Sequence, residues 1–167
     1  KVAGAMTVLL KDAIKPNLVQ STEGHPMICH GFPFANVAHG NNSVLANKVA
    51  LKLADYVVTE SGFGADSGFQ KIVEVTCRQS GMKVDCAVIV ATVRALKQHG
   101  GAFRLRPGRP YSAVKEAAET ENLPAVQTGC ENLRRAIEIV RMFGVPAVVV
   151  VNRFTADTDN EVALVRA

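Results

Sequence analysis

Short apolar runs alternate along the chain with longer segments in which apolar residues recur at helical spacing. The runs with strand character are Met27–His30, Asp55–Thr59, Ala87–Val90 and Pro146–Val151. Ala87–Val90 is largely β-branched and suits a strand that is buried on both faces. Each run is followed by a polar or Gly-rich loop and, for the most part, by a helical segment. This alternation predicts an α/β fold with a parallel sheet of four strands and helices on both faces.

Helical spacing of apolar residues predicts helices between these runs and at both ends of the chain. Asn41-Asn42-Ser43 is a candidate helix cap, and Gly144 is expected to end a helix because glycine is common just past helix ends. One short exposed helix is expected to be broken before Pro124. The predicted helices cover Val2–Ile14, Val44–Ala54, Lys71–Cys77, Ser112–Glu121 and Leu133–Phe143, and Thr155–Asp159 opens a last one.

Composition places the chain among soluble globular proteins. Of its 167 residues, 48 % are hydrophobic and 20 % are charged, which is ordinary for a packed core with a solvated surface. No apolar run approaches the length of about 20 residues that a membrane span needs, and the first residues lack a signal-peptide pattern. We therefore expect a cytoplasmic protein that has no membrane partner.

The cysteines and the net charge narrow the chemistry further. Cys29, Cys77, Cys86 and Cys130 are widely separated and form no CxxC pair, which argues against a disulfide framework or a zinc site. No resident metal site is predicted from these residues. The net charge of +4 slightly favours anionic small molecules. A nucleic acid partner is not expected, because no recognition motif accompanies the charge.

Basic side chains follow the central apolar run at the point where it ends. The segment between Ala87–Val90 and the helix-breaking pair Gly100-Gly101 contains Arg94, Lys97 and His99. Open α/β sheets bind ligands at the carboxyl ends of their strands. We therefore expect the loops after all four runs to converge on one crevice that contains Arg94. Lys97 and His99 carry a weaker signal and are expected to be solvated.

Four segments resemble a known family, and they occur in that family's order. They are KDAIKPNLVQ (Lys11–Gln20), PFANVAHG (Pro33–Gly40), ALKLADYVVTESGFGAD (Ala50–Asp66) and VATVRALKQHGG (Val90–Gly101). Each is similar to a segment of the formate–tetrahydrofolate ligases, and the resemblance covers nearly the whole chain. Four matches in the right order are far more specific than any one of them.

The resemblance implies an enzyme that converts formate and ATP into formyl phosphate and then transfers the formyl group to tetrahydrofolate, giving 10-formyltetrahydrofolate. ATP and Mg²⁺ are the implied cofactors, and formate and tetrahydrofolate are the implied substrates. The implied fold is a P-loop-type nucleotide-binding α/β domain with additional domains, and a homo-oligomer is expected. The alternative is a binding or scaffolding module that derives from the same family and has lost catalysis.

One motif of that chemistry is missing from the sequence. The chain contains no GxxxxGK[ST] loop, which cradles nucleotide phosphates and lies upstream in the family. We therefore expect residues 1–167 to be an interior part of the nucleotide- and folate-binding domain, truncated at both ends. A polypeptide of these residues alone is expected to lack ligase activity.

The loop after Asp55–Thr59 combines glycines with carboxylates. Gly62 and Gly64 would let the backbone approach a phosphate or formyl group closely. Glu60 or Asp66 would act on a bound Mg²⁺ through water. The alternative is a tight turn with solvated acids.

Four further side chains are candidates for contact with the nucleotide, the acyl phosphate or the folate. Arg94 is expected to neutralise the acyl phosphate, because a guanidinium binds phosphate through two parallel hydrogen bonds; a salt bridge to a helix carboxylate is the alternative. Asn152, just past the last apolar run, either contacts the adenine base or forms a turn. Asn36 and His39 are expected to hydrogen-bond the folate substrate, although a lone loop histidine is more often structural.

An aromatic residue in a polar loop is the strongest candidate for folate binding. The resemblance implies that Phe154 stacks on the flat pteridine ring, whereas the alternative is an ordinary loop anchor packed on the core. The sequence departs from the family at Ile72, where an aromatic residue is usual. Phe69 is a possible replacement for that missing aromatic side of the folate pocket.

Overall fold

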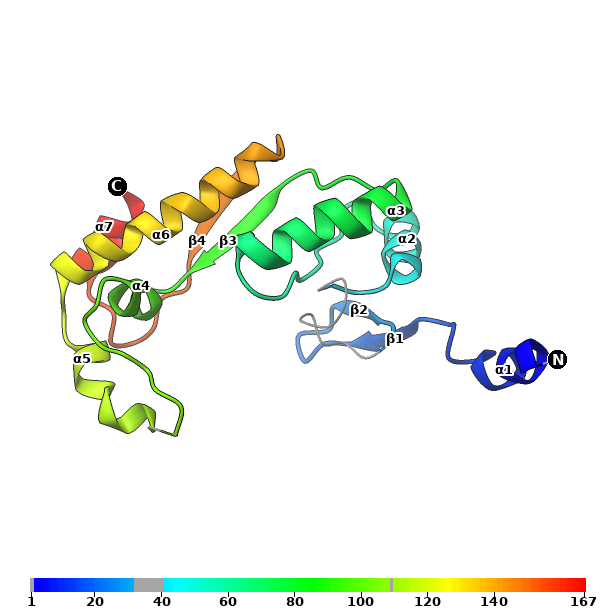
Figure 1. Ribbon diagram of the computed structural model, residues 1–167, viewed down its shortest axis with the longest axis horizontal. Helices are drawn as coiled ribbons and strands as arrows, with labels where there is room; N and C mark the ends of the chain where they lie inside the picture. The colour runs from blue at the N-terminus through cyan, green and yellow to red at the C-terminus, as the bar shows by residue number, and fades with distance from the viewer. Residues whose placement is uncertain (1, 32–40, 109) are drawn as a thin grey trace. The chain divides into compact units, whose positions relative to one another are not determined.

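The computed structural model describes residues 2–31, 41–108 and 110–167 of the chain (Figure 1). Contacts divide the chain into two compact units, Lys1–Lys83 and Val84–Ala167. The predicted α/β class is confirmed, because helices accompany a parallel sheet in the second unit. Among the residues that the structure describes, none of the helices combines the length and the hydrophobicity of a membrane span.

The first unit opens with a helix and a β-hairpin. Helix α1 (Val2–Leu10) ends earlier than predicted. Strands β1 (Asn17–Gln20) and β2 (Pro26–Cys29) pair antiparallel. The predicted strand at Met27–His30 is therefore present, but its place in the parallel sheet is wrong. A tight turn explains the difference, because Gly24 adopts a left-handed conformation with φ of 84° and returns the chain directly onto β1.

Helix α2 (Val44–Leu53) begins where the sequence predicted. The side chain of Ser43 accepts a hydrogen bond of 3.0 Å from the backbone N–H of Ala46. Asn42 ties this cap to the hairpin, because its Oδ1 accepts a hydrogen bond from the backbone N–H of His30. The predicted cap is confirmed, and it fixes the start of α2 against the end of β2.

The segment after α2 differs from its prediction. Asp55–Thr59 forms no strand, and its Tyr56 and Val58 are 91 % and 94 % exposed. β-branched and aromatic residues stabilise a strand by packing against neighbouring strands. In the described part of the first unit, β1 and β2 pair only with each other. The prediction of a strand here is wrong for that reason.

A long helical run completes the first unit. It consists of η1 (Ala65–Phe69), η2 (Ile72–Cys77) and α3 (Arg78–Ser80), with π-type turns in its first two parts. It begins well before the predicted start at Lys71. Asp66 lies in its first turn, where a carboxylate interacts favourably with the unpaired N–H groups of the helix end.

Two parallel strands form the sheet of the second unit. β3 (Ala87–Ala91) and β4 (Ala147–Val151) pair in register along their full length, and both were predicted. The described residues give this sheet two strands instead of the expected four. Val88 and Val148 are 60 % and 50 % exposed, because the helices of this unit leave one face of the sheet uncovered. The prediction of helices on both faces is therefore not met within this unit.

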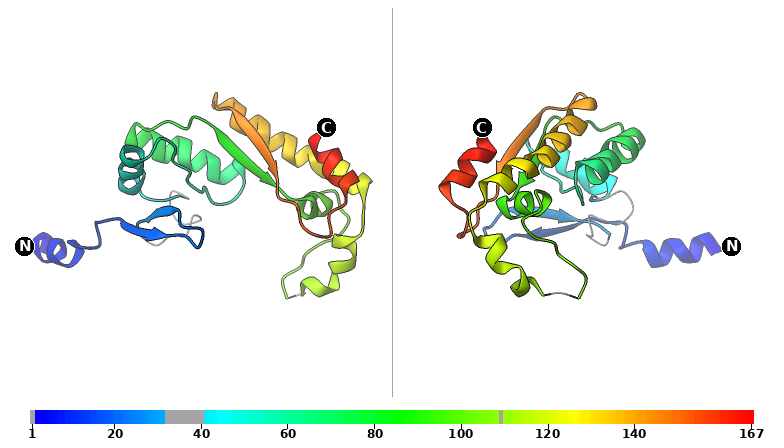
Figure 2. Two further views of the ribbon diagram at one scale, coloured as in Figure 1. Left: turned by 180° about the vertical axis from the view of Figure 1, so that it is seen from behind. Right: turned by 60° about the vertical axis from the view of Figure 1, so that its left-hand side comes forward.

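The helices of the second unit connect and cover these strands (Figure 2). The longest of them, α6, packs against α4, α7 and both strands. In chain order the helices are α4 (Val93–His99), η3 (Tyr111–Ala113), α5 (Lys115–Glu119), α6 (Leu123–Met142) and α7 (Asp159–Arg166).

Helix α6 is longer than its predicted range of Leu133–Phe143. It begins at Leu123 with Pro124 in its first turn. Backbone N–H groups in the first turn have no acceptor within the helix, so proline, which lacks this group, loses no hydrogen bond there. The side chain of Asn122 caps this end by accepting a hydrogen bond from Ala125 N. Pro124 therefore starts a helix here. At the other end, Gly144 adopts a φ of 72° and ends the helix as predicted.

Helices α4 and α6 cross at two glycines. A Cβ on Gly129 would lie 2.0 Å from the carbonyl oxygen of Leu96, and a Cβ on Gly100 would lie 1.8 Å from that of Ala125. Both distances are far below van der Waals contact, so only glycine permits this crossing. The close approach forms the main core cluster, whose buried members are Val93, Leu96, Val126 and Val162.

Candidate functional site

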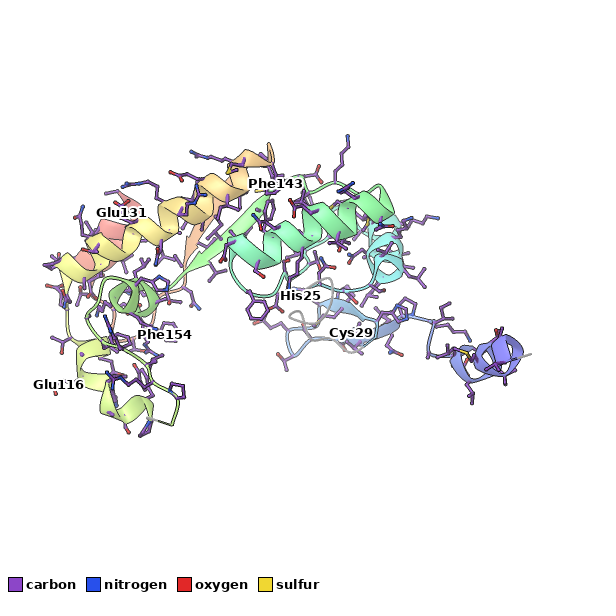
Figure 3. All side chains as sticks on the ribbon, in the orientation of Figure 1. His25, Cys29, Glu116, Glu131, Phe143 and Phe154 are labelled. Atoms are coloured by element: carbon purple, nitrogen blue, oxygen red, sulfur yellow. The ribbon has the colours of Figure 1, made fainter. Side chains whose placement is uncertain are left out.

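Arg94 and Phe154 come together where the two parallel strands end. The side chain of Thr92 caps α4 by accepting a hydrogen bond of 3.2 Å from Ala95 N, which places Arg94 in the first turn after β3. Phe154 follows β4 (Figure 3). The guanidinium carbon of Arg94 lies 4.7 Å from the centre of the Phe154 ring. The predicted meeting of loops at the carboxyl ends of the strands is confirmed for these two.

A second ring contacts the same guanidinium. The guanidinium carbon of Arg94 lies 4.9 Å from the centre of the Tyr111 ring. Both aromatic contacts are at cation–π distance. The N–H donors of Arg94 lie in the plane of the guanidinium and point outward from its edge. The aromatic contacts therefore do not use these donors. Sequence reasoning missed Tyr111, although an aromatic residue directly after a Pro/Gly/Arg-rich loop is a visible signal.

The predicted alternative for Arg94 was a salt bridge to a helix carboxylate. The ion pairs found among residues 2–31, 41–108 and 110–167 do not include Arg94. Its charge therefore has aromatic neighbours and no carboxylate partner in that part of the chain. A guanidinium in this state is suited to an anionic ligand.

A compact turn fixes Phe154 after β4. The backbone N–H of Phe154 donates a hydrogen bond of 2.8 Å to Oδ2 of Asp157, and the N–H of Asp157 donates one of 3.0 Å to the Phe154 carbonyl. Asp157 is only 5 % exposed, whereas Phe154 is 40 % exposed. Arg153 braces the turn by pairing with Asp159 at 2.9 Å. The ring of Phe154 is thus held in place while part of it stays open to solvent.

Asn152 stands between the sheet and this turn. Its backbone N–H donates a hydrogen bond of 2.8 Å to the carbonyl of Ala91, which extends the pairing of β3 and β4 by one residue. Asn152 itself is exposed. The structure thus places Asn152 at the same end of the sheet as Arg94 and Phe154, as the sequence predicted.

Lys97 was predicted to be solvated, and this is wrong. Its side chain has no exposed surface, and its Nζ lies 2.8 Å from Oε1 of Glu161, which is also fully buried. Nζ also donates hydrogen bonds to the carbonyls of Ala118 and Thr120, at 3.1 and 2.9 Å. All three ammonium donors are therefore paired. His99, in contrast, is exposed as expected.

Glu161 links the same pair to two helix ends. Its Oε1 accepts a hydrogen bond from Asn122 N, just before α6, and its Oε2 accepts one from Thr158 N, at the start of α7. Burial alone would raise the pKa of the Glu161 carboxyl. The hydrogen bonds from Lys97, Asn122 and Thr158 outweigh this and hold the pKa below its usual value. The buried pair therefore supports α4, the helix that carries Arg94.

The glycine-rich loop belongs to the first unit, and its two glycines have different surroundings. Gly62 is buried, and a Cβ on Gly68 would lie 1.9 Å from its carbonyl oxygen. The left-handed conformation falls on Phe63, with φ of 68°, and not on Gly62 or Gly64. Gly64 directly precedes η1. The missing side chain of Gly68 thus allows a close contact between the helical run and the loop at the Gly62 carbonyl.

The acidic and folate-site candidates of the first unit lie along the same segment. Glu60 and Asp66 are exposed, whereas Phe69 and Ile72 are each only 8 % exposed. No group of three or more His, Cys, Asp and Glu side chains suited to a metal ion is found among the described residues. The remaining candidates, Asn36 and His39, lie outside the described residues.

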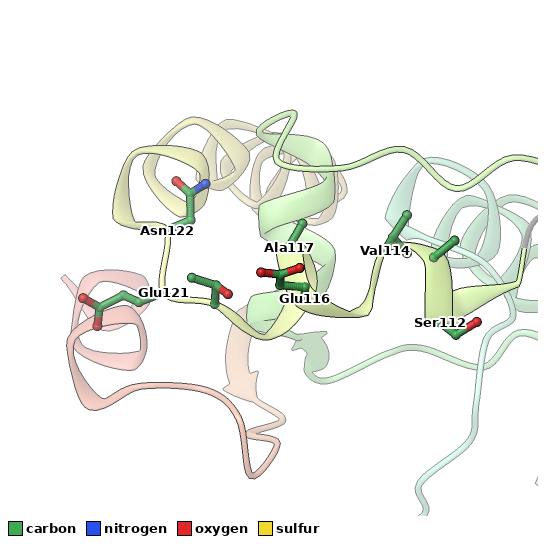
Figure 4. A pocket seen from close by; sticks show the side chains of 8 residues that line it. Ser112, Val114, Glu116, Ala117, Glu121 and Asn122 are labelled. Carbon is green, nitrogen blue, oxygen red and sulfur yellow. The ribbon is translucent and has the colours of Figure 1, made fainter.

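A cavity of about 430 Å³ lies beside α5 and is lined by residues between Ser112 and Asn122 (Figure 4). Glu116 and Glu121 contribute carboxylates to its lining, and Glu121 also accepts hydrogen bonds from Thr158 and Asn160. An acidic lining does not suit an anionic ligand. Neither Arg94 nor Phe154 lines this cavity, so it is not our candidate site.

Comparison with known proteins supplies the family. Residues 1–167 match the family model described as formate–tetrahydrofolate ligase. The formate–tetrahydrofolate ligase of Desulforamulus reducens is 58 % identical over 166 residues, covering 99 % of this chain and 29 % of the relative. That of a Sphingobium species is 56 % identical over 164 residues, covering 98 % and 27 %. That of Cereibacter sphaeroides is 55 % identical over 167 residues, covering 100 % and 28 %.

The chain spans between 27 % and 29 % of the length of these curated relatives. The match to the family model covers every residue of the chain. The resemblance of the four sequence segments is thereby confirmed, and the chain belongs to the formate–tetrahydrofolate ligase family.

Proposed function

We propose that the full-length protein containing this chain ligates formate to tetrahydrofolate in an ATP-dependent reaction, through formyl phosphate, and releases 10-formyltetrahydrofolate. Membership of the family supports the reaction class. The activity is proposed for the whole protein, because this chain covers less than a third of each relative compared.

The contact between Arg94 and Phe154 is the observation that carries this proposal. It combines a cation suited to a phosphate with an aromatic ring suited to a flat heterocycle, at a distance of 4.7 Å. Formyl transfer needs these two features side by side, because an acyl phosphate and a pteridine-linked amine must meet. Phe154 is 40 % exposed, so part of its ring is available for stacking.

The roles of the two residues follow from the bonds that change. The amine nitrogen of tetrahydrofolate attacks the formyl carbon, a C–N bond forms, and the C–O bond to phosphate breaks. The amine loses its proton, and the phosphate leaves with the electron pair of the broken bond. Arg94 stabilises that leaving group through its in-plane N–H donors. Phe154 orients the pteridine by stacking.

ATP supplies the phosphoryl group that activates formate. Asn152 is our candidate for contact with the adenine base, since it is exposed at the same end of the sheet. Glu60 and Asp66 are candidates to act on Mg²⁺ through water. A P-loop-type fold for the whole protein and a homo-oligomeric state remain part of the proposal.

We also propose that the protein acts in the cytoplasm. All four cysteines, Cys29, Cys77, Cys86 and Cys130, are free thiols in the structure. Free thiols are typical of proteins in reducing compartments. This agrees with a ligase that uses ATP and soluble substrates.

Substitution of Arg94 in the full-length protein tests the proposed site. Arg94→Ala should lower kcat for 10-formyltetrahydrofolate formation by about 10-fold to 100-fold, the range expected for the loss of a charged hydrogen bond. Arg94→Lys should recover only part of this, because lysine lacks the planar fork. Arg134→Ala is the matched control, since Arg134 is an exposed arginine of α6 paired with Glu131. Wild-type turnover in folded Arg94→Ala would remove Arg94 from the mechanism.

A further inference from the structure

We propose that Tyr111 is a positioning residue that holds the guanidinium of Arg94 in the orientation needed to bind an anion. This inference rests on the proposed function, in which Arg94 stabilises the leaving phosphate. Tyr111 and Phe154 would act together as two aromatic walls around one cation, and Tyr111 itself would not touch the reacting atoms.

The geometry of the two walls is the first support. The guanidinium carbon of Arg94 lies 4.9 Å from the centre of the Tyr111 ring and 4.7 Å from that of Phe154. A guanidinium beside an aromatic ring is attracted by its π-system. A ring face accepts no strong hydrogen bond, so both contacts leave the N–H donors of Arg94 free for an acceptor. Two such neighbours also limit the directions in which the planar group can turn.

Each wall is anchored by different contacts. Tyr111 belongs to the short helix η3 and packs against the buried cluster of Phe103, Val114 and Ala118. Phe154 is fixed by its turn with Asp157. Because the two anchors are independent, the ring of Tyr111 restricts Arg94 even if Phe154 moves against a ligand.

The ring of Tyr111 can be tested separately from its hydroxyl. It is buried, and it has no hydrogen-bond partner among the described residues. An unpaired buried hydroxyl destabilises the folded state. Replacement by phenylalanine would therefore keep both the ring and the fold, and would remove only a group that makes no hydrogen bond to Arg94.

The experiment uses the full-length enzyme with three substitutions of Tyr111, and Arg94→Ala as a second background. Tyr111→Leu and Tyr111→Met remove the ring and keep an apolar side chain, and each should lower kcat about tenfold. Tyr111→Phe should keep kcat within about twofold, because the cation–π contact remains. The KM for ATP should stay unchanged in all three. Thermal unfolding of each variant identifies any loss of activity that comes from unfolding.

A double-mutant cycle with Arg94 decides the mechanism. In the Arg94→Ala background, Tyr111→Leu and Tyr111→Met should cause no further loss, because Tyr111 acts only through Arg94. An equal loss in both backgrounds would overturn the inference, as would wild-type kcat in the two ring-less variants. A Tyr111→Phe variant as slow as Tyr111→Leu would also overturn it, since the hydroxyl would then be the active group.

The outcome for Arg94 separates this inference from the proposed function. If Arg94→Ala keeps wild-type turnover, the proposed role of Arg94 fails and the inference fails with it. If Arg94→Ala is slow while the ring-less Tyr111 variants are fast, only the positioning role of Tyr111 fails.

Discussion

The ammonium of Lys97 and the carboxylate of Glu161 lie 2.8 Å apart, and neither side chain has any surface exposed to solvent. A buried charge pair is tolerated only when hydrogen bonds satisfy the remaining donors and acceptors. Here the backbone supplies them from Ala118, Thr120 and Asn122. The pair therefore joins four helices of the second unit at one point: α4, the end of α5, the start of α6, and α7.

Breaking this pair should destabilise the protein strongly. Lys97→Met leaves the Glu161 carboxylate buried without its cation and should lower the free energy of unfolding by about 3–5 kcal/mol. Adding Glu161→Gln to Lys97→Met should recover part of that loss, because the unpaired charge is removed. Chemical denaturation of the full-length protein measures both effects.

An exposed ion pair of the same unit serves as the control. Arg134 and Glu131 lie 2.9 Å apart with both side chains well exposed, so Arg134→Met should change the stability by less than about 1 kcal/mol. Equal effects of Lys97→Met and Arg134→Met would show that burial of the Lys97 pair is unimportant for stability.

The same pair should make stability depend on pH in the acid range. The pKa of Glu161 is lower in the folded protein than its usual value, so this carboxylate stabilises the fold above the pKa of an unfolded glutamate, about 4.3. That contribution is lost as the pH falls from there through the folded pKa. The stability difference between wild type and Glu161→Gln should therefore be constant near pH 7 and shrink below about pH 4.3. Denaturation at a series of pH values measures it, and a difference that grows on acidification would contradict the lowered pKa.

The crossing of α4 and α6 should not tolerate a side chain at Gly129. A Cβ there would lie 2.0 Å from the Leu96 carbonyl oxygen, so Gly129→Ala forces the two helices apart and should cost about 1–3 kcal/mol of stability. Gly4→Ala is the control, because Gly4 lies in α1 and a Cβ there would meet open space. Alanine there should be neutral or stabilise by up to about 1 kcal/mol. Thermal unfolding compares the two variants, and a Gly129→Ala protein as stable as wild type would mean that the crossing relaxes easily.

The meeting of Arg94 and Phe154 was predictable from the sequence for a simple geometric reason. Both residues follow apolar runs that read as parallel strands, and the carboxyl ends of parallel strands share one edge of a sheet. The strand patterns of β3 and β4 were strong because valine, isoleucine and alanine fill them without interruption. Local composition was sufficient to place these two residues.

The misplaced residues depend on partners far away in the chain. We predicted that Lys97 is solvated because its carboxylate partner, Glu161, lies in another helix. The residues near Lys97 in the sequence give no sign of a buried ion pair. Likewise, Tyr111 is recognised as part of the site only through its contact with Arg94. Asp55–Thr59 has the composition of a strand, but a strand also needs a neighbour to pair with. Sequence periodicity describes single elements well and carries little information on such pairings.

The ring of Phe154 contacts Arg94 and also has surface available to a ligand. Its ring contacts the guanidinium of Arg94 at 4.7 Å, and it remains 40 % exposed. If the exposed part stacks on the pteridine, Phe154→Leu should raise the KM for tetrahydrofolate, since stacking contributes about 0.5–1.5 kcal/mol beyond simple burial. That range corresponds to an increase of about 2-fold to 13-fold. The KM for ATP should stay nearly unchanged.

Phe154→Tyr is the matched variant, because it keeps a ring of the same shape. It should leave the KM for tetrahydrofolate close to that of wild type, and steady-state kinetics of the full-length protein compares the two. Loss of one wall around Arg94 should also lower kcat in Phe154→Leu, so the two constants report on different contacts of one side chain. A KM for tetrahydrofolate that does not change in Phe154→Leu, combined with a lower kcat, would assign Phe154 to Arg94 alone and remove it from the folate site.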